Sequence, residues 1–452
     1  MMPFVDQLES IMPTVLTGSV VRTVGTTAAI AGFPAPVGAV VQIERQAGQA
    51  VLGEVIGFQD DLTIVYPLGD MTGVRRGNRA QLVKTSRYVS VGDQLLGRIV
   101  NAHGQCIDGR SQPPFVSRTK MNRRPPRATD RPPICTPIST GIRVIDGLLT
   151  CGEGQRVGIF SGSGVGKSVL LGMMARYTSA DVNVIALIGE RGREVNEFIQ
   201  RDLGPEGLKR SIVIVATGDE PALLRVQAAM TATAIAEYFR DAGKNVLLLM
   251  DSVTRFAMAQ REIGLAAGEP PTTRGYPPSV FGMLPKLVER TGRDQSGSIT
   301  AFYSVLVEGD DTNEPISDTV RGLLDGHIVL SRDLATKGHF PAVDVLASVS
   351  RLIQEVLPQD QCQAVMLLRQ MMAAYREHED LISVGAYRAG SNPTVDLAIA
   401  MRDEINNMLR QPIDEASNVP QAREAVMKLC QLCQAHHQQR TANAQRATLA
   451  TA

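Results

Sequence analysis

In this chain of 452 residues, the segment Ser161-Gly162-Ser163-Gly164-Val165-Gly166-Lys167-Ser168 is the strongest indication of the fold. It follows the apolar run Val157–Phe160 and precedes a helical pattern over residues 168–177. Glycines at alternate positions let the backbone turn tightly and aim N–H groups at phosphate oxygens. A helix that begins directly behind the turn adds the positive end of its dipole. The strand, the turn and the helix together predict a phosphate-binding P-loop.

Different residues of this motif are expected to bind different parts of a Mg²⁺-nucleotide complex. We expect Lys167 to reach the β- and γ-phosphates and the Ser168 hydroxyl to ligate Mg²⁺. The predicted nucleotide-binding segment is Gly162, Ser163, Gly164, Val165, Gly166, Lys167, Ser168 and Val169. The strict pattern begins with Gly, whereas this chain has Ser161, and Ser tolerates a positive φ poorly. The alternative is a Gly/Ser-rich turn that binds no ligand.

Two acidic residues follow other apolar runs of strand length. Asp251 ends the run that begins at Asn245, and Glu190 comes two residues after the run Val182–Ile188. The carboxyl ends of parallel strands meet at one edge of the sheet, where ligands bind. We therefore expect Asp251 to hold the Mg²⁺ water shell and Glu190 to polarise the attacking water. The alternatives are a turn that starts at Asp251 and a solvated loop around Glu190.

The pattern along the chain predicts three domains. Short β-branched runs separated by Gly and Pro over residues 18–86 favour a small β-barrel, and residues 1–88 are assigned to it. Apolar strands alternate with helices over residues 156–330, which indicates a parallel sheet covered on both faces. The predicted fold is thus α/β: a P-loop NTPase core (89–355), an N-terminal small β-barrel and a C-terminal helical domain (356–452).

Composition narrows the class of protein. The 46 basic residues balance the 46 acidic ones, which removes the usual electrostatic argument for a nucleic-acid partner. We expect no membrane span, because no stretch of about 18 apolar residues occurs. Six Cys fit a reducing compartment better than a disulfide framework. We expect no secretory signal at Met1–Gln7, which lacks an apolar core.

Two further segments leave alternatives open. The Pro-containing basic run over residues 119–133 predicts an extended surface strap, whose charges are either solvated or an anion-binding patch. Zinc is one interpretation of Cys430, Cys433, His436 and His437, which lie at near-helical spacing. Because strong zinc sites usually draw on two separated ligand pairs, ordinary helix packing is preferred.

Long blocks of this chain resemble the rotary-ATPase superfamily and, within it, the flagellar protein-export ATPases. The resemblance runs from about residue 18 to 430. It rests on Thr140–Leu148, Ser161–Tyr177, Gly189–Val195, Asp251–Glu262, Gly268–Phe281 and Glu308–Asp311. It implies an ATPase that uses ATP and Mg²⁺ and powers or gates the export of unfolded subunits.

The resemblance also implies roles for single residues. Glu190 falls on the family's catalytic glutamate, and Arg191 on the adjacent arginine near the γ-phosphate. Arg351 falls on the arginine finger that reaches into a neighbouring subunit's site. Phe340 falls on the loop whose aromatic ring stacks on adenine. From the residues alone, Arg351 is a surface arginine and Phe340 a core residue.

The partners implied by the resemblance begin with the chain itself, as a homohexameric ring. Pro270–Ser279 would face the ring's channel and a central-stalk-like coiled-coil protein. Phe4–Ile11 carries one apolar helical face and would dock a peripheral-stalk-like regulator. The other implied partners are the flagellar export apparatus, export substrates and chaperones. The implied location is cytoplasmic, peripheral at the inner-membrane export gate.

Three other hypotheses remain. A non-catalytic nucleotide-binding subunit or docking platform would lack the glutamate that this chain has at Glu190. An injectisome export ATPase or a rotary ATP synthase subunit is closely related, and the block Met173-Met174-Ala175-Arg176-Tyr177 favours the flagellar type over the injectisome type. An RNA-translocating hexamer is disfavoured by the neutral charge and by the lack of a recognisable RNA-binding aromatic motif.

Overall fold

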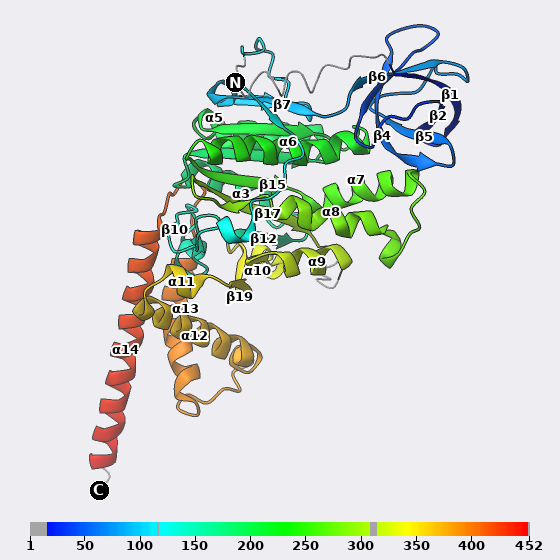
Figure 1. The fold of residues 1–452 in the computed structure, drawn as a ribbon. Coiled ribbons are helices and arrows are strands. Elements are labelled where there is room, and N and C mark those ends of the chain that lie inside the picture. The colour runs from blue at the N-terminus through cyan, green and yellow to red at the C-terminus, as the bar shows by residue number, and fades with distance from the viewer. Residues whose placement is uncertain (1–15, 115–116, 308–313, 451–452) are drawn as a thin grey trace.

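The computed structural model describes residues 16–114, 117–307 and 314–450, with side chains as far as residue 436 (Figure 1). The predicted docking segment Phe4–Ile11 and the block Glu308–Asp311 lie outside these ranges. Within them, no helix combines the length and the apolar character needed to cross a membrane.

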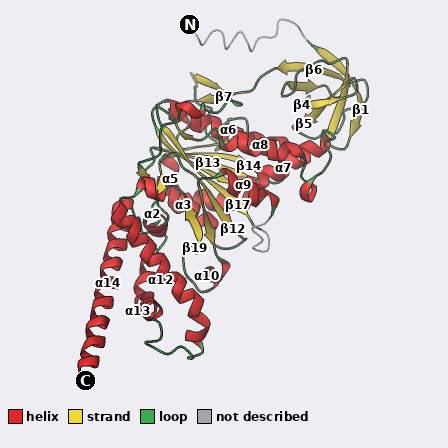
Figure 2. Ribbon diagram, turned by 60° about the horizontal axis from the view of Figure 1, so that its bottom comes forward, coloured by secondary structure: helices red, strands yellow, loops and turns green. Residues whose placement is uncertain are grey.

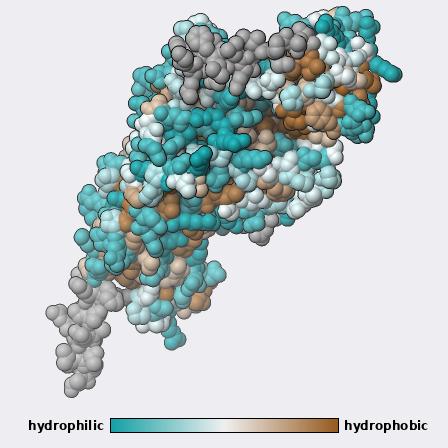
Figure 3. Space-filling model, viewed as in Figure 1, coloured by the Kyte–Doolittle hydropathy of each residue, from teal (hydrophilic) through white to brown (hydrophobic). Residues whose placement is uncertain are grey.

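The N-terminal strands form the small β-barrel that the sequence predicts. Six strands close in the order β1-β2-β5-β4-β3-β6. They are β1 (Thr17–Val24), β2 (Thr27–Ala31), β3 (Val40–Ile43), β4 (Val51–Gln59), β5 (Leu62–Pro67) and β6 (Arg79–Lys84). Their inward side chains, such as Ile30, Val41 and Val65, form a separate hydrophobic core. Hydrophilic residues cover most of the face shown in Figure 3, with hydrophobic ones interspersed on the barrel side.

The predicted strap lies between β8 (Arg98–Val100) of the central sheet and β10 (Pro137–Ile138). It begins as β9 (Ser117–Lys120), which pairs with β7 (Tyr88–Val91), and includes a 3₁₀ turn, η2 (Ala128–Asp130). Arg123 lies 2.7 Å from an Asp241 carboxylate oxygen, and the Arg131 guanidinium donates to the Thr291 carbonyl at 2.9 Å. Arg123 and Arg131 therefore contact the core. For these two residues, the basic run is neither a solvated surface charge nor an anion-binding patch, the two interpretations that the sequence left open.

The central sheet has the order β19-β18-β12-β17-β15-β13-β14-β8, with β16 paired beside β17. Neighbours are parallel except at β18–β19 and β16–β17. The strands are β8 (Arg98–Val100), β12 (Arg156–Ser161), β13 (Val182–Ile188), β14 (Ser211–Ala216), β15 (Asn245–Asp251), β16 (Gly292–Arg293), β17 (Ser298–Leu306), β18 (Gly326–Leu330) and β19 (Val343–Ser350). A short pair, β10 (Pro137–Ile138) and β11 (Cys151–Gly152), lies apart from it.

Helices cover both faces of this sheet, as the continuous apolar strands predict (Figure 2). Along β13, Val184 and Ala186 join one hydrophobic core, whereas Ile185 and Leu187 join the other. The first core includes α6 (Ala222–Asp241), α7 (Val253–Ala266), α8 (Pro278–Val288) and α9 (Pro315–Leu323). The second includes α2 (Arg143–Leu148), α3 (Lys167–Tyr177), α4 (Gly192–Glu197) and the π-helical η3 (Phe198–Leu203), with α5 (Gly204–Lys209) beside it.

The C-terminal part is helical, as predicted. It comprises α11 (Ile353–Val356), α12 (Gln359–Ser383), α13 (Pro393–Leu409) and the long α14 (Val419–Ala450), which projects from the body in Figure 1. These helices share the second core with α2 and α3. A Cβ at Gly147 of α2 would lie 2.7 Å from the terminal methyl group of Met408 and 3.1 Å from Val426, so α13 and α14 pack closely against this glycine. The domain limits at 88 and 355 remain predictions.

A buried ion pair gives a test of this packing. Glu237 on α6 receives two hydrogen bonds, at 2.8 and 2.9 Å, from Arg290 just after α8, and their side chains are 1% and 3% exposed. We predict that Glu237→Gln lowers the free energy of unfolding by about 3 kcal/mol, because it leaves a buried guanidinium without its counter-charge. Urea denaturation of the variant and of the parent chain measures this difference in the free energy of unfolding.

The matched control is Glu424→Gln, in an i,i+4 pair with Lys428 whose side chains are 66% and 68% exposed. Its urea midpoint should equal that of the parent chain, because solvent screens exposed pairs. Equal midpoints for both variants would contradict the assigned role of Glu237.

Candidate nucleotide site

The P-loop segment has the strand, turn and helix that its sequence predicts. β12 ends at Ser161 and α3 begins at Lys167. Within the turn, Gly164 has φ 79° and Gly166 φ 90°, the left-handed region that favours glycine. Ser161 is the last strand residue and pairs with Leu306 and Leu330. It needs no positive φ, so the departure from the strict pattern carries no backbone cost.

The start of α3 provides donors for an anion. The first N–H groups of a helix, here those of Lys167 and the next two residues, have no acceptor inside the helix. Within the described residues, no side chain caps this end at Gly166. The Ser168 hydroxyl lies on the exposed side of the same turn. The loop therefore presents backbone donors, a lysine and a hydroxyl at one point.

Three charged side chains meet beside this loop, one from the start of α3 and two from the ends of different strands. Lys167 forms an ion pair with Asp251 at the end of β15, and its Nζ lies 3.9 Å from Oε1 of Glu190, which follows β13. Only 12% of Lys167, 14% of Glu190 and 6% of Asp251 is exposed. The structure thus brings together the lysine and both carboxylates proposed for phosphate, cation and water.

The backbone before Glu190 explains its position. Gly189 has φ 71°, and a Cβ there would lie 3.0 Å from the Arg255 side chain. The Gly189 N–H donates to the Ala216 carbonyl at 2.6 Å, and the Glu190 carbonyl accepts from Gly218 at 3.0 Å. The turn therefore aims the Glu190 carboxyl along the carboxyl edge of the sheet, at a place where only glycine fits before it.

The electrostatic setting of Glu190 suits a group that accepts a proton. Burial raises the pKa of Glu190 to about 7, and the nearby Asp251 charge adds to the rise, whereas Lys167 and, to a smaller extent, Arg255 oppose it. A carboxyl whose pKa lies near neutrality combines a useful ionised fraction with basicity, as general bases require.

Ser304 is a site residue that sequence reasoning missed. Its hydroxyl donates to Asp251 Oδ1 at 2.5 Å from the middle strand β17. It occurs inside a run otherwise typical of a buried strand, so no local signal marks it. The bond orients the carboxylate that Lys167 also contacts.

The donor set fits the implied cofactors. The Ser168 hydroxyl and the Asp251 carboxylate supply oxygen ligands, which Mg²⁺ prefers. Both lie beside the glycine turn and Lys167, where a nucleotide's phosphates would bind. In the part of the chain that is described, no group of three His, Cys, Asp or Glu side chains could hold a metal ion, although His437 lies beyond the described side chains.

Phe340 lies against the P-loop, outside the hydrophobic cores. A Cβ on Gly166 would be 3.5 Å from its ring, and the ring side chain is 47% exposed. It lines a cavity of about 560 Å³ together with Val169 and Met173 of α3. This largely apolar space beside the phosphate turn has the character of a base-binding pocket.

The other wall of this cavity comes from a segment that the sequence did not predict, Gln411-Pro412-Ile413. The Gln411 N–H donates to the Phe340 carbonyl at 3.0 Å. Arg176 and Tyr177, at the end of α3, donate to the Ile413 carbonyl at 2.8 and 3.1 Å. The same helix that begins at the phosphate turn therefore holds the far wall of the pocket.

The side chains of two predicted residues, Arg191 and Arg351, form their contacts outside this centre. Arg191 is 83% exposed and pairs with Glu194 at 3.0 Å. Arg351 donates its N–H to the Asp325 carbonyl, and the Asp325 N–H donates to Arg156 at the start of β12. Because Ser161 is five strand residues further on, Arg351 lies roughly 16 Å from the P-loop of its own chain. Their roles remain predictions.

A fluorescence experiment tests the base pocket, since the chain has no Trp. We predict that Phe340→Trp retains nucleotide binding and that its emission changes on ATP addition, because an indole replaces a ring beside the site. Phe340→Ala should weaken ATP binding about 5- to 10-fold, equivalent to about 1 kcal/mol of lost stacking. Phe58→Ala, at a 56% exposed residue of the barrel, is the control and should bind normally.

Three family models match the chain in order. Residues 18–82 match the ATP synthase alpha/beta family β-barrel domain, and residues 141–350 match its nucleotide-binding domain. Residues 357–428 match the type III secretion EscN ATPase C-terminal domain. The three matched segments correspond to the barrel, the sheet with its P-loop and the C-terminal helices.

Curated relatives and solved structures agree with these matches. The flagellum-specific ATP synthase of Bacillus subtilis is 51% identical, over 91% of this chain and 94% of the relative. The type 3 secretion system ATPase of Xanthomonas euvesicatoria is 50% identical, over 88% and 91%. The structure of the assembled ATPase EscN from enteropathogenic E. coli superimposes with a TM-score of 0.85 at 44% identity, covering 91% of this chain and all of that one. The chain therefore belongs to the ATP synthase alpha/beta family and is an ATPase of its flagellar and type III secretion branch.

Proposed function

We propose that this ATPase hydrolyses Mg²⁺-bound ATP between the subunits of a homohexameric ring and energises or gates flagellar protein export. The observation that carries the proposal is the meeting of Lys167, Asp251 and Glu190 beside the glycine turn. These groups supply a cation for the phosphates, a ligand for the metal and a base for water.

Each residue has a distinct task in the proposed reaction. Lys167 and the N–H groups of the turn hold the β- and γ-phosphates, and Phe340 fixes the base. Ser168 and Asp251 would hold Mg²⁺, which would neutralise charge on the phosphates when bound. Glu190 accepts a hydrogen bond from the water in line with the γ-phosphate and takes up its proton.

In the proposed ring, a neighbouring subunit supplies the arginine that a single chain cannot bring to its own P-loop. Arg351 lies too far from its own P-loop to touch a γ-phosphate, so it acts in the site of a neighbouring subunit. The structure of EscN is of an assembled form, and a second EscN structure contains its central stalk EscO. By similarity, we propose that this chain assembles with itself and binds a central-stalk-like coiled coil, which Pro270–Ser279 would meet.

The flagellar assignment rests on the relatives. Flagellum-specific ATP synthases of Bacillus subtilis and Treponema pallidum are 51% and 56% identical, and the type 3 secretion system ATPase of Xanthomonas euvesicatoria is 50% identical. We therefore keep the injectisome ATPase as the second candidate. A cytoplasmic position at the export gate, a peripheral-stalk-like regulator and cargo chaperones belong to the same proposal. Deleting the gene and scoring flagella against secretion distinguishes the two systems.

Substitutions at the charged centre test the division of tasks. Lys167→Ala should weaken nucleotide binding and abolish turnover, because it removes the charge that faces the phosphates. Glu190→Gln should retain binding but lower kcat by about 10²- to 10⁴-fold, because the amide cannot accept the proton. Phosphate release by the assembled ring measures the turnover of both variants.

Glu206→Gln serves as the control, because this 82% exposed carboxylate lies on α5, away from the site. It should turn over ATP at the parent rate. If the parent ring bound ATP tightly but released no phosphate, the non-catalytic platform would replace this proposal.

The raised pKa of Glu190 predicts a pH dependence. A protonated carboxyl cannot act as a base, so the single-turnover rate should rise with pH as Glu190, whose pKa is about 7 without bound Mg²⁺, loses its proton. Mg²⁺ at Asp251 offsets the charge that helps to raise this pKa, and should shift the midpoint downwards. In Glu190→Gln the residual rate should not follow this ionisation; an unchanged midpoint in that variant would assign the titration to another group.

A further inference from the structure

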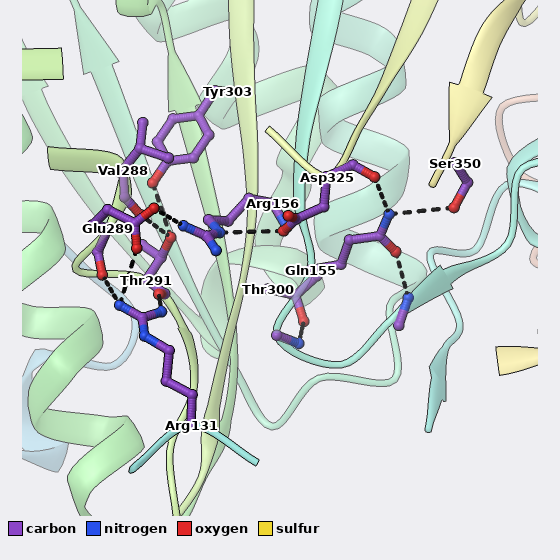
Figure 4. A network of polar contacts seen from close by, with 12 residues as sticks. Arg131, Gln155, Arg156, Val288, Glu289, Thr291, Thr300, Tyr303, Asp325 and Ser350 are labelled. Atoms are coloured by element: carbon purple, nitrogen blue, oxygen red, sulfur yellow. Dashed lines mark hydrogen bonds and ion pairs between the residues drawn. The ribbon is translucent and has the colours of Figure 1, made fainter. Parts of the chain in front are cut away.

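A network of polar contacts lies at the opposite edge of the sheet from the P-loop, where β12 begins (Figure 4). It joins the residues before β12, the turn before β18, the end of β19 and the segment after α8. It adjoins the backbone of Arg351, which the nucleotide site of the same chain does not use.

Gln155 is the buried centre of this network, with no exposed surface. Its Nε2 donates to the Asp325 carbonyl at 3.0 Å and to the Ser350 Oγ at 3.2 Å. Its Oε1 accepts from the Gly152 N–H at 2.8 Å. The Ser350 hydroxyl in turn donates to the Thr150 carbonyl at 2.9 Å. The residue directly before Arg351 is therefore bonded to two buried groups.

Asp325 holds Arg351 itself. The Asp325 carbonyl, already bonded to Gln155, also accepts the Arg351 N–H at 3.0 Å. The Asp325 carboxylate receives the N–H and Nε of Arg156 at 3.1 and 3.2 Å. Arg156 then reaches Glu289 at 2.7 Å. The strap also takes part in this network, because Arg131 lies 3.2 Å from the other carboxylate oxygen of Glu289.

The side chain of Arg351 contrasts with its backbone. It is exposed, and its Nη2 has a marginal contact of 3.4 Å with the Arg321 carbonyl. The backbone is thus held by the bond from the Arg351 N–H to Asp325 and by the bonds of the preceding Ser350 side chain to the buried Gln155 and Thr150, while the Arg351 side chain is exposed. This combination, a rigid base and a projecting donor, is what a group needs to act precisely in another subunit.

We propose that Gln155, Ser350 and Asp325 are positioning residues for Arg351, and that they set where its guanidinium enters the neighbouring subunit's nucleotide site. This inference rests on the proposed function of Arg351. Loss of the finger can cost ~10³ to 10⁵ in rate, and a 1 Å misplacement about 10². Damage to the positioning contacts should therefore cost about 10- to 100-fold in kcat.

The competing explanation is that these contacts only stabilise the edge of the sheet. A stability role would lower the unfolding midpoint and disturb the site of the same chain. A positioning role lowers kcat in the next subunit's site and leaves ATP affinity unchanged, because the P-loop lies at the other edge. The two explanations therefore differ in which subunit's site fails.

Mixed rings separate them. We would prepare Ser350→Ala, which removes only one hydroxyl, and Gln155→Leu, which removes the amide at similar size. Each of these variants is mixed with Lys167→Ala, which has an inactive P-loop but an intact Arg351. At equal proportions about one interface in four combines an intact P-loop with an intact Arg351. We expect unchanged ATP affinity, a 10- to 100-fold lower kcat for each variant alone, and partial recovery to about a quarter of the parent rate on mixing.

Two comparisons make the outcome decisive. Thr233→Ala removes a buried hydroxyl that bonds the Ala229 carbonyl within α6, and should keep the parent kcat. Arg351→Ala mixed with Lys167→Ala tests the finger itself. If that mixture recovers but the Ser350→Ala and Gln155→Leu mixtures do not, or if both variants keep the parent kcat, the positioning role is wrong. If the Arg351→Ala mixture does not recover, the finger and this inference both fail.

Discussion

The ion pair between Lys167 and Asp251 links the order of the central strands to the position of the phosphate turn. A buried ammonium group and a buried carboxylate are tolerated only when they face each other. Their meeting requires β12 and β15 to end at the same edge of the sheet, although β17 lies between them. β17 adds Ser304, which bonds the same carboxylate. The order of the strands, the position at which α3 begins and the ion pair therefore depend on one another.

The two edges of the sheet have different tasks, and β12 connects them. Its carboxyl end at Ser161 leads into the phosphate turn, whereas its amino end at Arg156 belongs to the network below Arg351. A strand of six residues separates the two by more than a side chain can reach. One chain thus contains both halves of the proposed catalytic centre at opposite edges of its sheet, which makes assembly part of the proposed chemistry.

The C-terminal helices contribute to the nucleotide site as well as to the architecture. Gln411 bonds the Phe340 carbonyl, and its side chain accepts from Arg143 and donates to the Gly141 carbonyl. The pocket wall is therefore tied to the loop before α2 and to the end of α3. Any movement of the C-terminal helices against the core would change the shape of the base pocket, because these contacts cross the boundary between them.

The main helices and strands, and the residues whose chemistry is local, could be predicted from the amino-acid sequence. The P-loop is one continuous segment, and the apolar runs that end in Asp251 and before Glu190 carry their own signal, because strand burial and glycine conformation are read within a few residues. Only the tertiary structure decided which strand tips are neighbours, that Ser304 orients Asp251, and that Gln411 to Ile413 face Phe340. It also decided that Arg351 lies at the far edge. These facts depend on contacts between residues far apart in the chain, and sheet order, unlike strand length, leaves no periodic trace in the sequence.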